Sequence, residues 1–234
     1  MSTATVEFRI PHGFTEFLPA ENNEEAYEAV LDRLGEAART LTTEQRRDLT
    51  LLYAAASTAL DTLAPIWSGS CAGTVDGRLS TATLTVAEIA TGAGVPPATA
   101  AAGLMQLLTD PQADGTPPKR QVSRLTAPAG PVVVTLEPGP GLLRTDGGHV
   151  PVLSAKAYLP MPARDQGVLL VELATPDIDH WADIYAPLFS FVVQSIRFPD
   201  ERSNPAIDQA PGDAVPDPPG AAPTTDPFGT ALHT

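Results

Sequence analysis

The chain has 234 residues, enough for one domain with its own core, and a formal net charge of -14. This acidity repels phosphate backbones and anionic lipids, which argues against nucleic acid and membrane surfaces as partners. No apolar run reaches the roughly 18 residues of a membrane span, and residues 1–13 lack the basic start and apolar centre of a signal peptide. We therefore expect a cytoplasmic protein.

The first 63 residues predict a strand followed by a helical hairpin. The alternating letters VEFRI indicate a half-buried strand that ends near Ile10. Asn22 is a candidate N-cap for an amphipathic helix, and Thr42 with Gln45 has the spacing of a capping box for a second helix. The short connection between them predicts two antiparallel helices over about residues 22–63.

An Asp-Gly pair marks a turn in the centre of the chain. Asp76 and Gly77 suit a two-residue type I′ turn, and the β-branched letters RLSTATLTV that follow favour a strand. We therefore expect Ser70–Val75 to pair antiparallel with Arg78–Thr83. The preceding letters WSG also resemble the Trp-x-Gly loop of small helical-hairpin substrates of type VII secretion, but that alternative requires a helix after the glycine.

The single cysteine, Cys71, lies among small residues of the first of these strands. A nucleophilic thiol needs a nearby base and a lowered pKa, and no sequence signature around Cys71 suggests either. The sequence favours a small buried side chain with no catalytic role.

The rest of the ordered chain predicts two helices around a series of strands. A middle helix is expected at about residues 97–109, followed by short strands separated by turns and a buried strand with the letters GVLLVELAT. A C-terminal helix is expected at about residues 178–195. Strands joined by hairpins rather than by βαβ units indicate an α+β fold with a mainly antiparallel sheet, formed by residues 1–198 as a single domain.

Residues 199–234 differ in composition from the rest of the chain. They contain eight prolines and six acidic residues, too few apolar residues to form a core, and predict a disordered tail. The alternative is a tether that ends in a short binding motif, for which Phe228 and Leu232 are the best partner-binding anchors.

Four stretches carry a family resemblance: FRIPHGF, AGTVDGRLSTATLTV, APAGPVVV and WADIYAPLFSFVVQSIRF. They resemble a family of uncharacterised actinobacterial proteins over residues 6–198, and no functional residue comes with that likeness. The order of elements is also similar to the PsbP and Mog-type α+β fold. Its members include photosystem accessory subunits and a nuclear-transport GTPase-binding factor, so this resemblance implies a binding module. The two helices expected within residues 22–63 depart from that pattern.

Motifs for known catalytic chemistry are largely missing from the sequence. There is no phosphate-binding glycine loop, no HExxH and no pair of cysteines, and the four histidines lie far apart, so we expect no metal site and no cofactor. The densest titratable group comprises Asp177, Asp179 and His180, which could serve acid–base chemistry in a small hydrolase. The same residues also suit the acidic first turn of a helix.

The sequence thus favours a non-catalytic protein-interaction module with an acidic surface, such as an adaptor, a secretion-accessory protein or an immunity-type protein. The expected partner is another protein, and a basic one would complement the charge. A small hydrolase using Asp177, Asp179 and His180, or a protein that binds a small ligand, are the alternatives. The oligomeric state stays open.

Overall fold

The computed structural model of the protein describes most of the chain before the predicted tail. The described residues are 6–17, 20–39, 41–43, 46–47, 50, 53, 65–91, 94–111, 118–139, 142–143, 149–162 and 167–199.

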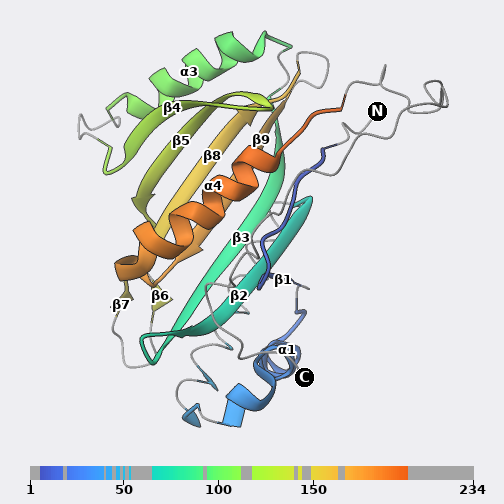
Figure 1. The fold of residues 1–234 in the computed structure, drawn as a ribbon, viewed down its shortest axis with the longest axis vertical. Helices are drawn as coiled ribbons and strands as arrows, with labels where there is room; N and C mark the ends of the chain where they lie inside the picture. Colours follow the sequence, from blue (N-terminus) through green and yellow to red (C-terminus); the bar gives the residue numbers. More distant parts are fainter. Residues whose placement is uncertain are drawn as a thin grey trace, which may run out of the picture.

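A seven-stranded antiparallel sheet forms the centre of the molecule, in the order β1-β2-β3-β9-β8-β5-β4 (Figure 1). Its strands are β1 (Thr15–Glu16), β2 (Trp67–Val75), β3 (Arg78–Ala90), β4 (Gln121–Ala127), β5 (Gly130–Pro138), β8 (Leu153–Pro160) and β9 (Gly167–Thr175). The short strands β6 (Leu142–Leu143) and β7 (His149–Val150) pair with each other. This confirms the expected mainly antiparallel sheet combined with helices.

The β2–β3 hairpin turns at the predicted position. Val75 pairs with Arg78, and the register continues to Ser70 opposite Thr83. Asp76 and Gly77 both have positive φ, at 49° and 74°, as a type I′ turn requires. The strand prediction is confirmed over this stretch, and no helix follows the Trp-x-Gly motif.

Three α-helices are described from end to end, and the described residues 43, 46, 47, 50 and 53 are also α-helical. The three helices with described bounds are α1 (Asn23–Leu34), α3 (Pro97–Thr109) and α4 (Ala186–Ser195). α3 has the predicted bounds. The predicted C-terminal helix begins at the expected residue, but its first two turns are a 3-10 segment (Ile178–His180) and a π segment (Trp181–Tyr185), so only its second half is α-helical.

α1 begins at the predicted cap. The Asn22 Oδ1 atom accepts hydrogen bonds from the backbone N–H groups of Glu24 and Glu25, both at 3.0 Å. The helix continues as a 3-10 segment, Gly35–Arg39. The first helix of the expected hairpin is therefore confirmed. Most of its second helix lies outside the described residues.

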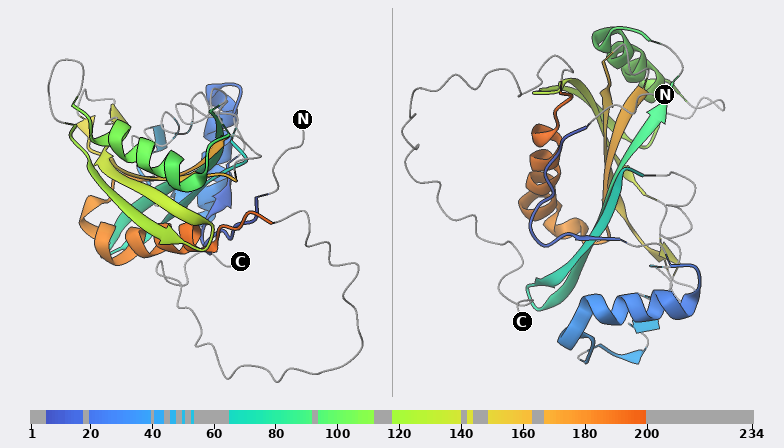
Figure 2. Two further views of the ribbon diagram at one scale, coloured as in Figure 1. Left: turned by 90° about the horizontal axis from the view of Figure 1, so that it is seen from above. Right: turned by 90° about the vertical axis from the view of Figure 1, so that its right-hand side faces the viewer.

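The helices cover both faces of the sheet (Figure 2). α4 packs on one face, where alternate residues of the central strands are fully buried and form the main core with the helix. α3 packs on the opposite face through Ala101 and Leu108, which contact Val133. α1 lies on that same opposite face, at the far end from α3, in a smaller apolar cluster that includes the stacked rings of Phe17 and Tyr53.

The N-terminal segment differs from its prediction. The strand expected to end near Ile10 is wrong: the described residues show only a single bridge there, between Glu7 and Arg197. The alternation did identify the buried side, because Val6, Phe8 and Ile10 pack against the main core. The segment lies beside the extended chain after α4, where only one pair of residues meets, so a ladder does not form.

No helix among the described residues is long and apolar enough to cross a bilayer.

Candidate functional site

Two of the three predicted acid–base residues meet after the end of β9. Asp177 Oδ1 lies 2.8 Å from His180 Nδ1, three residues later in the chain. Asp179 stands apart: its side chain is 79% exposed and its carboxylate lies 3.8 Å from Arg78. Asp177 occupies the N-cap position of the helical segment that begins at Ile178, as the helix-start alternative expects, but its side chain makes no capping hydrogen bond there.

The other nitrogen of His180 faces the tip of the β2–β3 hairpin. His180 Nε2 lies 3.2 Å from Asp76 Oδ2. The imidazole is largely buried, at 16% exposed, whereas the Asp76 side chain is 81% exposed. Both imidazole nitrogens are thus engaged with carboxylates from distant parts of the sequence.

A buried serine completes the cluster on the inner side. The Ser80 hydroxyl, on β3, donates a hydrogen bond to Asp177 Oδ2, and the residue is only 1% exposed. Its oxygen also lies 2.5 Å from the Tyr185 hydroxyl. Because a serine hydroxyl has one proton, Tyr185 is the donor in this second contact. We call Asp76, Ser80, Asp177, His180 and Tyr185 the hairpin clasp.

A threonine at the end of β9 fixes the backbone of the clasp. The Thr175 hydroxyl donates to the Thr81 carbonyl at 2.7 Å and accepts from the Asp177 N–H at 3.0 Å. Thr175 is fully buried, so the position of Asp177 relative to β3 is fixed by hydrogen bonds on both its backbone and its side chain.

The clasp shifts the titration of its members. The hydrogen bonds to Asp177 and then Asp76 raise the pKa of His180 above its ordinary value. Burial acts to raise the pKa of Asp177, but the hydrogen bonds from Ser80 and His180 outweigh it and hold that pKa below its ordinary value. Burial raises the pKa of Tyr185 to about 12, which keeps its hydroxyl protonated as a donor.

The order of groups in the clasp does not match nucleophilic catalysis. In a Ser-His-Asp triad the imidazole lies between the hydroxyl and the carboxylate, so that it can take the hydroxyl proton. Here the carboxylate of Asp177 lies between Ser80 and His180. A carboxylate with a lowered pKa is a poor base for a serine hydroxyl. The geometry therefore fits a contact that joins the β2–β3 hairpin to the chain after β9 better than it fits acyl transfer.

A second polar cluster crosses the sheet on the face that carries α3. Lys156 Nζ lies 2.8 Å from Glu137 and 3.7 Å from Glu172, and Arg120 Nε lies 3.6 Å from Glu137. The Ser154 hydroxyl donates to Glu172 at 2.6 Å. We call these five residues the sheet charge network. Its two cations balance its two carboxylates, so it has no net charge to attract an ionic ligand.

Burial affects the lysine at the centre of this network. It acts to lower the pKa of Lys156, but the hydrogen bond to Glu137 and the charge of Glu172 outweigh it, so the pKa is raised and the ammonium stays charged. No local sequence pattern marks this cluster, because its members come from four separate strands or their flanks.

The remaining predicted residues do not join either cluster. Cys71 is 3% exposed and belongs to the main core, as expected for a small buried side chain. Phe228 and Leu232 lie outside the described residues, as does the predicted tail after Pro199. No group of three or more metal-ligating side chains occurs within the described part of the chain.

Comparisons with known proteins show a structural likeness. No family model matches the chain, and no curated protein matches it. Among solved structures, the chain is similar to LpqN of Mycobacterium tuberculosis, whose crystal structure is described as that of a protein involved in cell envelope biogenesis. The two share 8% identity over 83% of each chain, with a TM-score of 0.37. The resemblance to the PsbP and Mog-type fold and the cytoplasmic location stay predictions.

Proposed function

We propose that this protein is a non-catalytic protein-interaction module with an acidic binding surface. The observation that carries this proposal is the arrangement of the hairpin clasp, which contains Asp177 and His180 of the titratable group predicted from the sequence. Its serine is bonded to a carboxylate and a tyrosine, and its imidazole is bonded to two carboxylates. The Ser80 hydroxyl and both imidazole nitrogens of His180 are therefore held in structural hydrogen bonds, and no base is directed at a nucleophile within the clasp.

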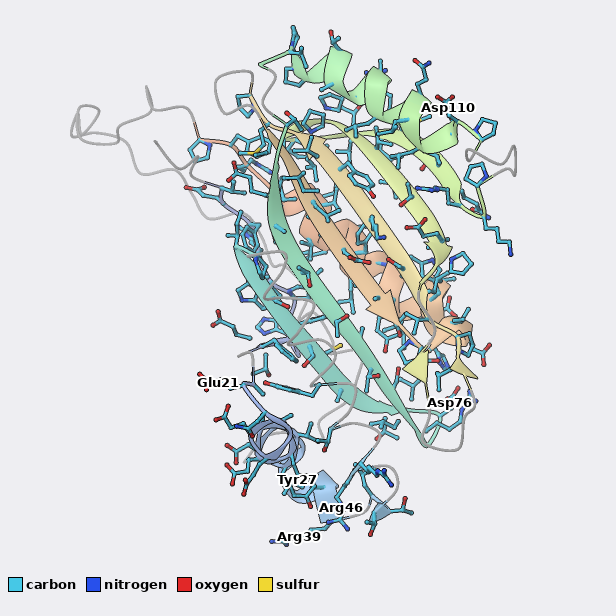
Figure 3. All side chains as sticks on the ribbon, turned by 180° about the vertical axis from the view of Figure 1, so that it is seen from behind. Glu21, Tyr27, Arg39, Arg46, Asp76 and Asp110 are labelled. Carbon is cyan, nitrogen blue, oxygen red and sulfur yellow. The ribbon has the colours of Figure 1, made fainter. Side chains whose placement is uncertain are left out.

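The outer face of α1 is the best candidate for the acidic surface. Ala26 and Val30 are buried on the inner face of the helix, whereas Glu24, Glu25 and Glu28 are exposed. Exposed carboxylates on one helix face attract a basic segment of a partner and raise its encounter rate. Figure 3 shows Glu21 and Tyr27, which mark this helix, at one end of the molecule and Asp110 at the other.

A pair of matched charge reversals tests the location of this surface. Glu28→Lys and Asp110→Lys each change the net charge by the same amount, at opposite ends of the molecule, and both residues are exposed. The probe is a labelled Lys/Arg-rich peptide, with a Gly/Ser peptide of equal length as the neutral control. We expect Glu28→Lys to weaken binding by about threefold or more, and Asp110→Lys to have a smaller effect. Equal effects of the two variants would contradict a surface on α1.

A hydrolase is the alternative function, and an activity screen separates it from the proposal. The purified protein is incubated with ester, amide and glycoside substrates, alongside His180→Ala. We expect no turnover by either protein above the rate in buffer. Turnover by the native protein that His180→Ala abolishes would overturn the non-catalytic proposal, provided that circular dichroism shows the variant to be folded.

A further inference from the structure

Among the described residues, β4 is the last strand of the sheet and no strand pairs with its outer side. It pairs with β5, and the strand order stops there, with β4 lying at the outer edge beneath α3 (Figure 1). Residues 123–126 are exposed in succession, so side chains on both faces of the strand reach solvent. Leu125 is 48% exposed. An edge strand in this state presents unpaired backbone groups that another extended chain can bind.

The register identifies which backbone groups face outward. Thr126 pairs with Pro131, which has no N–H group, so these two form a non-hydrogen-bonded pair of the antiparallel ladder. Pairs alternate along such a ladder, and Val122 and Arg124 are therefore also in non-hydrogen-bonded pairs. The N–H and C=O groups of Val122, Arg124 and Thr126 point away from β5, toward the free edge.

The free edge is basic, although the protein as a whole is acidic. Lys119 and Arg124, which lie outside the sheet charge network, supply two of the 14 basic residues within six positions, whereas the net charge is -14. Lys119 and Arg124 are exposed. A second copy of the chain, paired antiparallel through β4, would bring this basic segment against itself, which disfavours such a dimer. Charge complementarity therefore points to an acidic occupant.

We propose that the free edge of β4 binds an extended acidic segment of a partner protein by antiparallel strand addition. The occupant places acidic side chains beside Arg124 on the α3 face of the sheet. It places apolar side chains beside Leu125 on the α4 face. Its sequence accordingly alternates acidic and β-branched residues over about the seven residues of β4. This inference is independent of the acidic surface on α1.

Amide hydrogen exchange of the native protein gives the direct test. The probe is a soluble peptide of alternating Glu and Val, and the control peptide has Lys in place of Glu. We expect the Glu peptide to slow exchange of the Arg124 and Thr126 N–H groups, which gain partners, more than that of Ser123 and Leu125, which already bond to β5. No change at Arg124 and Thr126, or equal protection by the Lys peptide, would overturn the proposal.

A proline at the free edge provides a second test. Thr126→Pro removes an outward N–H without removing a donor to β5, whereas the control Thr126→Ala keeps that N–H. We expect the proline variant to bind the Glu peptide more weakly than the native protein does, by up to about tenfold. The alanine variant should bind it like the native protein. Equal binding by both variants would contradict strand addition.

Sedimentation experiments test whether a second copy of the chain occupies the edge instead. A native dimer that Thr126→Pro dissociates would assign the edge to a second copy and overturn the acidic occupant. The α1 variant Glu28→Lys should leave this binding unchanged, which separates this site from the proposed acidic surface.

Discussion

His180 Nε2 lies 3.2 Å from Asp76 Oδ2, although 104 residues separate the two in sequence. The contact joins the tip of the β2–β3 hairpin to the start of the C-terminal helical segment. Because Asp177 holds the other imidazole nitrogen at 2.8 Å, the histidine bridges two carboxylates and is most strongly bound when it carries a positive charge. The stability of the fold should therefore depend on pH through this residue.

The pH dependence has a defined direction. The pKa of His180 is raised from 6.5. Its contribution to the free energy of unfolding is therefore fully present below pH 6.5 and is lost as the pH rises through the folded-state pKa. The pKa of Asp177 is lowered from 3.8. Its contribution to the free energy of unfolding is therefore present above pH 3.8 and is lost as the pH falls through its folded-state pKa. The clasp should be strongest between these limits. We expect the difference in melting temperature between the native protein and His180→Gln to be larger at about pH 5.5 than at about pH 9.

Asp76→Asn is the matched control for this experiment. Asn-Gly suits a type I′ turn as well as Asp-Gly does, so the hairpin should keep its geometry while the carboxylate is lost. We expect this variant to show a weaker dependence of melting temperature on pH than the native protein. A difference between native protein and His180→Gln that is constant from pH 5 to pH 9 would contradict an ionic clasp.

The buried hydroxyl of Ser80 should matter more for stability than its size suggests. Ser80→Ala leaves Asp177 Oδ2 and the Tyr185 hydroxyl without this partner in a buried setting, which costs about 1–3 kcal/mol of unfolding free energy. Urea denaturation measures the loss, and Ser123→Ala, at an exposed position of β4, should stay within about 0.5 kcal/mol of the native protein. A similar small effect at both positions would show that the hydroxyl network contributes little.

The parts of this structure that local chemistry determines were predictable from sequence. Asp76-Gly77 specifies its own turn, and the apolar spacing of residues 97–109 gave the bounds of α3. Contacts between distant segments were not predictable. Asp177 does precede the helical segment that begins at Ile178, as expected, but its side chain bonds to Ser80 of a distant strand instead of capping that segment. The sheet charge network was not predictable for the same reason, since only the strand register brings Lys156 to Glu137.

The turn itself can be tested at Gly77. Its φ of 74° is strained for residues with a side chain, and a Cβ there would meet no atom within 4 Å, so the cost of substitution comes from the backbone alone. We expect Gly77→Val to lower the unfolding free energy by about 1 kcal/mol or more. Urea denaturation measures this loss, and a variant as stable as the native protein would contradict the turn type.

The Trp-x-Gly motif also makes a specific prediction, because its two ends pack against each other on β2. A Cβ built on Gly69 would overlap the Trp67 ring and would lie 2.7 Å from the Thr15 carbonyl oxygen of β1. The glycine is therefore needed for the close approach of the indole and of the edge strand. We expect Gly69→Ala to lower the unfolding free energy by about 2 kcal/mol, within the range for overpacked sites.

Two further variants distinguish this packing from a general effect of adding a methyl group. Gly103→Ala, in the middle of α3 with no atom within 4 Å of the new Cβ, should instead stabilise the protein by about 0.5–1 kcal/mol. In a Trp67→Leu background the overlap with the ring disappears and the contact with Thr15 remains, so the cost of Gly69→Ala should fall without vanishing. If that cost is the same in both backgrounds, the Trp67 ring does not determine the need for glycine, and the motif has another basis.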